Sequence, residues 1–170
     1  MTLLSPKTAT PSKTRRKTAK TMAFVLDTDT FSAYVREDLP VVRRVTEYDG
    51  LIYLSAVALR ETLKGALAAV ADAESPNPRY KNVTVADAYD LLIGLVEQAA
   101  RFPVLPYTND AEALYRALPK SVVRIGSRDC RIATSAVASG MAVVTANTRH
   151  FAQIAAAMPE LRFVDWRIAS

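Results

Sequence analysis

The sequence predicts an α/β fold built on a central, mainly parallel sheet of about four to five strands. Short apolar runs alternate along the chain with longer segments of helical periodicity, and this alternation is typical of parallel sheets covered by helices on both faces. A polar side chain follows several of the runs, most clearly Asp27. With 170 residues, the chain is long enough for one domain with its own core.

The first half of the chain contains two predicted strands and three predicted helices. Short apolar runs mark the strands, and apolar residues at helical spacing mark the two longer helices. Ser75-Pro76-Asn77-Pro78 forms a loop between these helices. In the later one, the expected buried stripe is Ala88, Leu91, Leu92, Leu95 and Val96. The predicted strands are residues 23–26 and 51–54, and the predicted helices are 28–35, 57–73 and 85–100.

The second half continues the alternation. Thr108 or Asn109 is suited to cap one helix, and Ser127 to cap the next, because a side-chain oxygen accepts from the first free amides. Gly140 suits the exit of the second helix. This places Asp129 in a first helical turn, where the helix dipole favours a carboxylate. The predicted strands are residues 102–105, 142–145 and 162–166, and the predicted helices are 109–118, 128–139 and 149–157.

The positive charge is concentrated in the first 22 residues. The chain has a formal net charge of +5, and this segment holds six basic residues and no acidic one. Without it, 16 basic residues face 17 acidic ones, so the remainder is close to neutral. We expect residues 1–22 to be a disordered basic extension, with Met22 as an alternative start. A nucleic-acid-binding arm is the second interpretation of this segment.

Composition excludes several kinds of site. Cys130 is the only cysteine and His150 the only histidine, so a disulfide framework within one chain and a site built from cysteines and histidines are both ruled out. No apolar run approaches the roughly 18 residues that span a bilayer, and residues 1–22 lack the apolar stretch of a secretory signal. We therefore expect a cytoplasmic protein that does not enter the membrane.

Three acidic residues and one amide stand where a parallel fold would bring them together. Asp27 and Asn147 follow apolar runs, and the carboxyl ends of neighbouring parallel strands open onto one crevice. Glu61 and Asp129 lie on predicted helices. Carboxylates that converge repel one another unless a hard cation lies between them. The pattern favours a magnesium site.

Four blocks of sequence stand out along the chain: Phe24-Val-Leu-Asp-Thr-Asp-Thr-Phe, Leu54-Ser-Ala-Val-Ala-Leu-Arg-Glu-Thr-Leu-Lys-Gly, Ile125-Gly-Ser-Arg-Asp-Cys-Arg-Ile-Ala and Val144-Thr-Ala-Asn-Thr-Arg-His-Phe. In this order they resemble the PIN-domain ribonucleases, and most closely the VapC-type toxins of bacterial toxin–antitoxin pairs. The resemblance covers nearly the whole chain from Met22, and Val164-Asp165-Trp166 closes it. It predicts a PIN-like three-layer α/β/α sandwich over residues 23–170.

The resemblance also implies a function. It implies endonucleolytic hydrolysis of RNA phosphodiester bonds, with an antitoxin as partner and a homodimer as the usual assembly. The residues that correspond to Asp27, Glu61 and Asp129 bind Mg²⁺ or Mn²⁺ in such toxins, and Asn147 occupies a position that is commonly Asp or Asn. Asn147 is neutral where some relatives carry a carboxylate, which weakens the expectation of a second ion.

We therefore hypothesise that Asp27 and Asp129 coordinate the principal Mg²⁺ ion. Glu61 coordinates the ion or orients the attacking water, and Asn147, the fourth residue of the catalytic set, holds a metal-bound water. Thr145 and Arg149 are candidates for substrate binding, since an arginine can pair with phosphate.

Each of these residues also has a structural interpretation. Asp27 could cap a helix, Asp29 could cap a helix beginning near Thr30, and His150 is expected on the surface or at a helix cap. A non-catalytic PIN module that binds protein or RNA is the main alternative function. A haloacid-dehalogenase-like phosphatase is a second, suggested by Asp27-Thr28-Asp29, but no lysine follows Thr145 as that family requires.

Overall fold

A five-stranded parallel sheet forms the centre of the molecule. The structure, a computed structural model, describes residues 22–168, so the predictions for residues 1–21 lie outside the described part of the chain. The strand order is β3-β2-β1-β4-β5, and every pairing is parallel. The predicted parallel sheet is confirmed. The strands are β1 (Phe24–Leu26), β2 (Ile52–Ser55), β3 (Val104–Leu105), β4 (Ala142–Val144) and β5 (Arg162–Val164).

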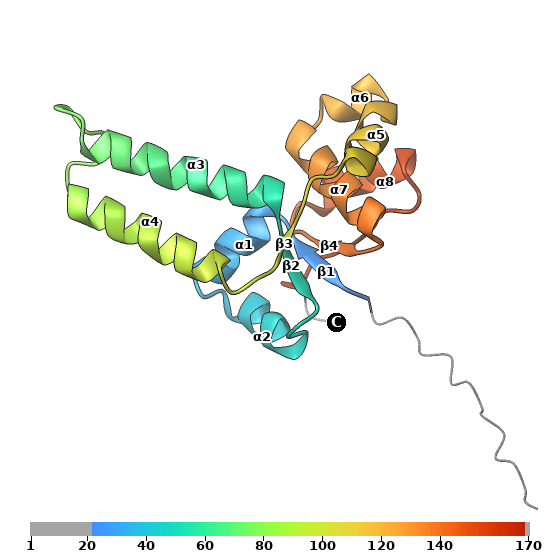
Figure 1. Cartoon of the computed structure of the whole chain (residues 1–170), viewed down its shortest axis with the longest axis horizontal. Coiled ribbons are helices and arrows are strands. Elements are labelled where there is room, and N and C mark those ends of the chain that lie inside the picture. The colour runs from blue at the N-terminus through green and yellow to red at the C-terminus, as the bar shows by residue number, and fades with distance from the viewer. Residues whose placement is uncertain (1–21, 169–170) are drawn as a thin grey trace, which may run out of the picture.

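Helices cover both faces of this sheet and make three layers, as predicted. Figure 1 shows α1, α3 and α4 on one side of the strands and α5 to α8 on the other. None of the helices in residues 22–168 is long and apolar enough to span a membrane. The helices are α1 (Thr28–Val35), α2 (Leu39–Glu47), α3 (Ala56–Ala73), α4 (Val85–Ala99), α5 (Asn109–Ala117), α6 (Lys120–Val123), α7 (Ser127–Ser139) and α8 (Thr148–Ala157).

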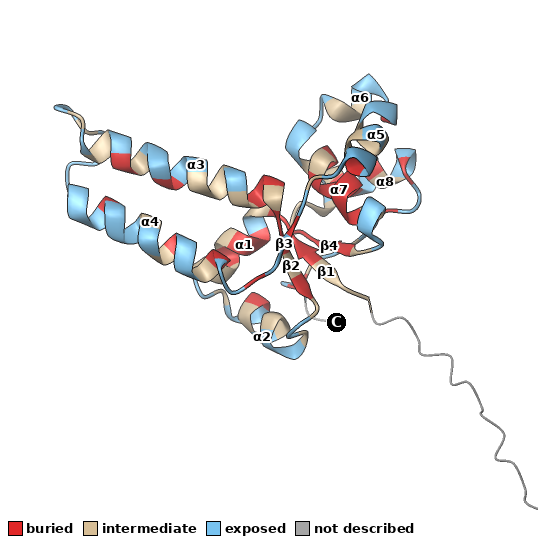
Figure 2. Ribbon diagram, viewed as in Figure 1, coloured by how far each residue is buried: buried red, intermediate tan, exposed pale blue. Residues whose placement is uncertain are grey.

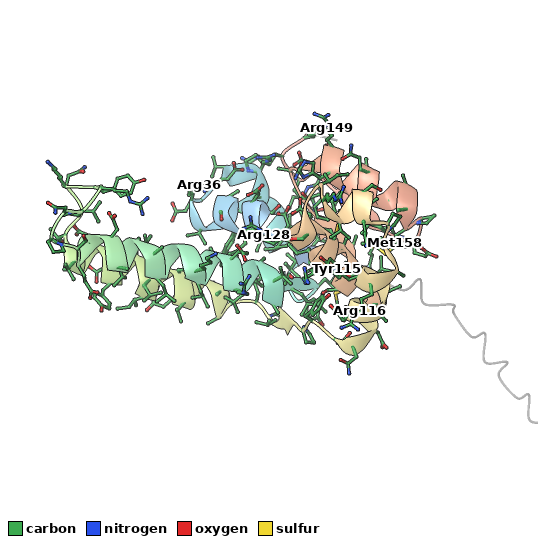
Figure 3. All side chains as sticks on the ribbon, turned by 90° about the horizontal axis from the view of Figure 1, so that it is seen from above. Arg36, Tyr115, Arg116, Arg128, Arg149 and Met158 are labelled. Atoms are coloured by element: carbon green, nitrogen blue, oxygen red, sulfur yellow. The ribbon has the colours of Figure 1, made fainter. Side chains whose placement is uncertain are left out.

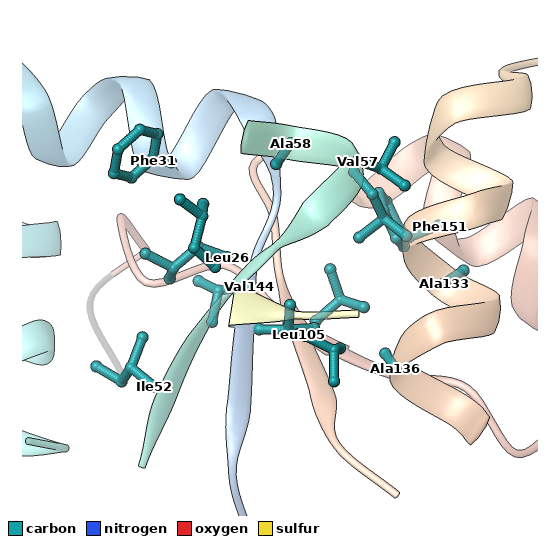
Figure 4. Close-up of a cluster of buried hydrophobic side chains, with 14 of the residues drawn as sticks. Leu26, Phe31, Ile52, Val57, Ala58, Leu105, Ala133, Ala136, Val144 and Phe151 are labelled. Atoms are coloured by element: carbon teal, nitrogen blue, oxygen red, sulfur yellow. The ribbon is translucent and has the colours of Figure 1, made fainter. Parts of the chain in front are cut away.

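The core is formed where both helical layers meet the sheet. Leu26 and Val144, on neighbouring central strands, are completely buried. Figure 4 shows Phe31 of α1 on one side of these strands and Phe151 of α8 on the other. Both aromatic rings are fully buried. Burial on both faces explains why the strands appear in the sequence as continuous apolar runs rather than as alternating patterns.

The α3 and α4 hairpin extends beyond the sheet, and its outer part is largely exposed (Figures 1 and 2). The predicted buried stripe of α4 was therefore partly wrong. Ala88 and Leu95 are buried, but Leu91 is 56% exposed and Val96 is 50% exposed. The periodicity is real, but no other part of residues 22–168 covers that face. Leu67 of α3 is likewise 56% exposed.

Two short helices and one helix start differ from expectation. Neither α2 nor α6 was predicted: α2 has Pro40 in its first turn and buries only Val41, while α6 is a single turn. Ser127 is not the cap of α7. Gly126 takes that place, and its carbonyl accepts the amide of Cys130 at 3.0 Å, so the helix begins one residue earlier.

Candidate metal centre

The carboxyl ends of three adjacent strands form the floor of the candidate site. Leu26 of β1 is in register with Leu54 of β2 and with Val144 of β4. The residues after Leu26 and Val144, which are Asp27 and Thr145, therefore lie side by side at one edge of the sheet. The amide of Asp27 donates to the carbonyl of Val144 at 3.2 Å and extends this alignment by one residue.

Asp27 has a local structural role as well as a place in the site. It is the N-cap of α1, and its Oδ1 accepts the amide of Thr30 at 2.8 Å. The residue is only 3% exposed. Burial raises the pKa of Asp27 above its ordinary value, although hydrogen bonds with Thr145 and Thr30 lower it in part. Asp29 is exposed and is not the cap of this helix.

Thr145 and Asn147 lie between Asp27 and the second carboxylate. Thr145, which is completely buried and follows the strand residue paired with Leu26, accepts the amide of Asn147 on Oγ1 at 2.9 Å. The Nδ2 of Asn147 then donates to Oδ2 of Asp129 at 3.1 Å. Residues more than one hundred positions apart in sequence are thereby held at one edge of the sheet.

Asp129 is positioned from three directions. It lies in the first turn of α7, and Gly126 makes room for its side chain: a Cβ atom at Gly126 would lie 3.1 Å from Oδ2 of Asp129. His150 also reaches this carboxylate. Its Nδ1 lies 3.1 Å from Oδ2 of Asp129 and 2.7 Å from Nδ2 of Asn147. Nδ1 accepts from Asn147 or donates to Asp129, depending on the protonation of the ring.

The contact between His150 and Asp129 was not predicted, since His150 was expected only on the surface or at a cap. One signal was present in the sequence. His150 is three residues after Asn147, and α8 begins between them, so both side chains lie at the same end of that helix.

Glu61 approaches from α3 and is held by two arginines. Arg60 Nη1 lies 2.5 Å from Oε1 and Arg128 Nη1 lies 2.5 Å from Oε2. The Glu61 side chain is only 8% exposed, whereas the two arginine side chains are 70% and 65% exposed. Figure 3 shows Arg128 between the ribbons of α3 and α7. Because Arg128 precedes Asp129, its ion pair also brings the start of α7 close to Glu61.

The oxygen atoms available as metal ligands at this edge suit a hard cation. They are carboxylate and amide oxygens, which Mg²⁺ and Mn²⁺ prefer. Within residues 22–168, no three acidic, histidine or cysteine side chains are already grouped closely enough to hold a metal ion. Each carboxylate instead has its own neighbour: Arg60 and Arg128 for Glu61, Asn147 and His150 for Asp129. A cation would have to compete with these contacts.

Two further side chains near the site differ in accessibility. Arg149 is exposed at the start of α8, and Figure 3 shows it at the outer edge of the molecule. Cys130 is completely buried, and burial raises the pKa of its thiol to about 11. A thiol that is neutral and inaccessible is a poor nucleophile.

The class of this protein is defined by a parallel five-stranded sheet with Asp27 at the carboxyl end of β1, and with Glu61 and Asp129 on helices α3 and α7 at the same edge. The family model for the PIN domain matches residues 24–157. This is most of the chain, and the chain belongs to the PIN-domain family. Among the curated proteins, none matches it.

Solved structures with the same fold come from bacterial toxin–antitoxin complexes. A chain of DNA-bound VapBC from Salmonella typhimurium is 24% identical, with a TM-score of 0.64, over 85% of this chain and 98% of that one. A chain of VapBC2 from Rickettsia felis is 18% identical, with a TM-score of 0.65, over 85% of this chain and 99% of that one. A chain of a toxin–antitoxin complex from Klebsiella pneumoniae is 14% identical, with a TM-score of 0.60, over 85% of this chain and 98% of that one. At these identities the likeness shows a shared fold.

Proposed function

We propose that this protein is a divalent-metal-dependent endoribonuclease that hydrolyses RNA phosphodiester bonds as the toxin of a toxin–antitoxin pair. Membership of the PIN-domain family supports a nuclease. The observation that carries the proposal is that Asp27 and Thr145 adjoin at one edge of the sheet, that hydrogen bonds lead from Thr145 through Asn147 to Asp129, and that Glu61 faces the same end of α7. An RNA substrate and an antitoxin would be met in the cytoplasm.

In this proposal Asp27, Glu61 and Asp129 hold Mg²⁺, and Mn²⁺ can replace it. When bound, Mg²⁺ supplies a Lewis acid for the scissile phosphate and lowers the pKa of the attacking water. Asn147 is a catalytic-site residue that keeps Asp129 in position by donating to Oδ2. Glu61 becomes available for the ion as Arg60 and Arg128 turn from its oxygens toward the substrate.

The two candidates for substrate binding receive different roles. Thr145 has no exposed surface, so we assign it to positioning Asp27 and Asn147 rather than to touching RNA. Arg149 is exposed and lies two residues after Asn147, at the same end of α8. Its guanidinium group is free to meet an RNA phosphate that enters this edge.

The direct test is RNA cleavage by the full chain, purified free of any partner, in Mg²⁺, in Mn²⁺ and in a chelator. Asp129→Asn should abolish the cleavage seen with either metal. Asp110→Asn is a matched control, because Asp110 also lies in the first turn of a helix but is exposed on α5. It should cleave like the wild type.

Cleavage that survives in chelator, or in Asp129→Asn, would contradict the proposal. If a folded wild-type protein binds RNA and cleaves none with either metal, the non-catalytic binding module becomes the better interpretation. Circular dichroism of each variant separates loss of chemistry from loss of fold.

We further propose that the antitoxin lies in a groove between α1, α3 and α4. This groove has a volume of about 390 Å³ and passes from Glu61 along Ala66 and Leu95 to the exposed Leu91. An amphipathic segment of a partner could bury its apolar face there and reach the catalytic acid. Leu91→Glu should therefore prevent a stable complex with the antitoxin, which is expected to be encoded beside this chain.

A homodimer would use another face of the same hairpin. Leu59, Leu63 and Leu67 line an open apolar groove of about 540 Å³ along α3, and a second copy would remove this surface from water. Leu67→Glu should yield a monomer in analytical ultracentrifugation. Leu91→Glu is the control, since Leu91 and Leu67 are equally exposed but line different grooves. Leu67→Glu should lose the homodimer and keep the antitoxin complex, and Leu91→Glu should do the reverse.

A further inference from the structure

A second pocket adjoins Glu61 on the side of α7, and its chemistry differs from that of the acidic site. It has a volume of about 480 Å³ and lies between the first turns of α3 and α7. Three arginines line it and no acidic residue does. We name it the arginine pocket. Its lining is Ala56, Val57, Arg60, Tyr107, Ser127, Arg128 and Arg131.

Arg60 and Arg128 connect the arginine pocket to the catalytic acid. Each uses one nitrogen, Nη1, on an oxygen of Glu61. A guanidinium group has further N–H donors in the same plane, and both side chains are mostly exposed. Their remaining donors are therefore accessible from the pocket. If Glu61 binds a cation, both arginines lose part of their counter-charge and gain affinity for an anion.

Arg131 provides the third positive charge of this pocket. Within residues 22–168 it makes no ion pair. Its guanidinium carbon lies 3.9 Å from the ring centroid of Tyr115 and 6.0 Å from that of Tyr107. This cation–π contact holds the group in place without discharging it. An arginine fixed in this way is prepared for a planar, bidentate contact with phosphate.

Tyr107 adds an aromatic wall to the arginine pocket. Its hydroxyl donates to Oε2 of Glu112 at 2.6 Å, which fixes the ring. Burial, together with this hydrogen bond, raises the pKa of Tyr107 to about 12, so the phenol stays neutral at physiological pH. Aromatic rings beside arginines are the surfaces on which single-stranded RNA packs its bases and phosphates.

We propose that the arginine pocket binds the part of an RNA strand next to the scissile phosphate. The flanking phosphate contacts Arg128 and Arg131, Arg60 completes the cationic rim, and the adjoining base packs against Tyr107. This inference rests on the proposed nuclease function and extends it with a subsite. It also explains why two arginines lie against a catalytic carboxylate: they neutralise Glu61 until the metal and the substrate replace them.

Arg131→Met tests the subsite without altering a contact to Glu61, and methionine preserves the apolar stem over Tyr115. Arg43→Met is the matched control, because Arg43 is exposed on α2 and lies outside the pocket. Both variants of the full chain lose one charge. Binding of a fluorescently labelled, mixed-sequence single-stranded RNA would be measured by anisotropy in chelator, where the proposed cleavage cannot occur, over a range of salt concentrations.

We expect Arg131→Met to raise Kd about tenfold, the effect of losing one charge-assisted hydrogen bond. It should also reduce the slope of log Kd against log salt by about 0.7, the value for one phosphate contact on a single strand. Arg43→Met should bind within about twofold of the wild type, since surface charges remote from a contact have small effects. Arg131→Lys should recover part of the affinity, because it restores charge without the planar fork.

Equal Kd values for Arg131→Met and Arg43→Met would overturn the subsite, and so would a wild type that binds no RNA. Cleavage in Mg²⁺ distinguishes this failure from failure of the proposed function. If Arg131→Met cleaves RNA in a metal-dependent way with an unchanged KM, the proposed RNA subsite is wrong and the proposed nuclease function stands. If RNA binding depends on Arg131 but no metal supports cleavage, the RNA subsite stands and the proposed nuclease function is wrong. Loss of antitoxin binding with unchanged RNA affinity would identify the pocket as a protein site.

Discussion

Asp27 combines two tasks that the sequence presented as alternatives. Its carboxylate caps α1, and the same side chain occupies the strand end where the metal site is proposed. A side chain that satisfies a helix amide also gains a fixed orientation, so the cap helps to direct the other oxygen toward the site. For this reason Asp27→Ala is a poor test of catalysis, since losing an N-cap costs about 1 kcal/mol of stability.

Asp27→Asn should stabilise the protein at neutral pH. Asparagine caps a helix as well as aspartate does, and it removes a buried charge. Because burial raises the pKa of Asp27 above 3.8 in the folded state, the ionised carboxylate costs stability above its folded pKa. This cost disappears as the pH falls below 3.8, where both states are protonated. Thermal unfolding without metal should show a higher Tm for the variant at pH 7 and equal values near pH 3.

Asp27→Ala, measured in parallel, isolates the contribution of the cap. It also removes the charge but cannot accept from Thr30, so its Tm at pH 7 should lie below that of Asp27→Asn. An asparagine variant less stable than the wild type at neutral pH would mean that hydrogen bonds to the carboxylate outweigh its burial.

Cys130 should resist thiol reagents for as long as the protein is folded. The side chain has no exposed surface, and burial raises its pKa to about 11, so the reactive thiolate is both scarce and inaccessible at pH 8. Labelling with Ellman's reagent should be slow in buffer and immediate in guanidinium chloride. Fast labelling in buffer would instead report frequent opening of α7.

At the scale of elements, α4 illustrates how a helix can be locally well specified and only partly buried. Thr84 and Asp87 form a capping box at its start: Thr84 Oγ1 accepts the amide of Asp87 at 3.1 Å, and Asp87 Oδ2 accepts the amide of Thr84 at 2.9 Å. Local signals of this kind set the helix ends. They do not decide which face another surface will cover.

Thr84→Ala should lower the free energy of unfolding by about 1 kcal/mol, the usual value for an N-cap. Hydrogen exchange should rise first at the amides of the first turn of α4, because those donors lose their partners. Thr46→Ala is the control. Its hydroxyl bonds to the carbonyl of Val42 within α2, and alanine favours the helix interior, so its stability should be unchanged or slightly higher.

At the scale of the whole molecule, the proposed cation would join elements that meet only in the folded state. Asp27 follows β1, Glu61 lies on α3 and Asp129 on α7. An ion that binds only this arrangement shifts the folding equilibrium, by about 1.4 kcal/mol at ten times its Kd. For a domain of this size the gain corresponds to a rise in Tm of about 3 to 6 °C.

Mg²⁺ should produce this rise in the wild type and a smaller one in Asp129→Asn. NaCl at equal ionic strength is the control for screening, and Asp110→Asn is the control for the loss of an acidic residue. If Mg²⁺ raises the Tm of Asp129→Asn and of the wild type equally, Asp129 does not bind the ion.

The strand ends show how far the sequence could predict the candidate site. The apolar runs before Asp27 and Asn147 indicated buried parallel strands, and the carboxyl ends of neighbouring parallel strands open onto one crevice. In the structure Thr145 lies beside Asp27, and Asn147 follows two residues later. Their meeting therefore follows from local pattern and backbone geometry. Predicting that Glu61 and Asp129 would face this edge required the family resemblance, since helical periodicity does not say where a helix is placed.

What the sequence by itself determined is the order of the five strands and of the described helices other than α2 and α6, the position of most helix ends, and the place of Asp27 after a strand. Only the tertiary structure decided that Arg60 and Arg128 meet at Glu61, that His150 reaches Asp129, and that the leucines of the outer hairpin stay uncovered. The physical reason is the distance along the chain over which each interaction acts. Propensity, capping and periodicity act over a few residues, whereas burial and ion pairing depend on a partner from elsewhere in the chain, or from another chain.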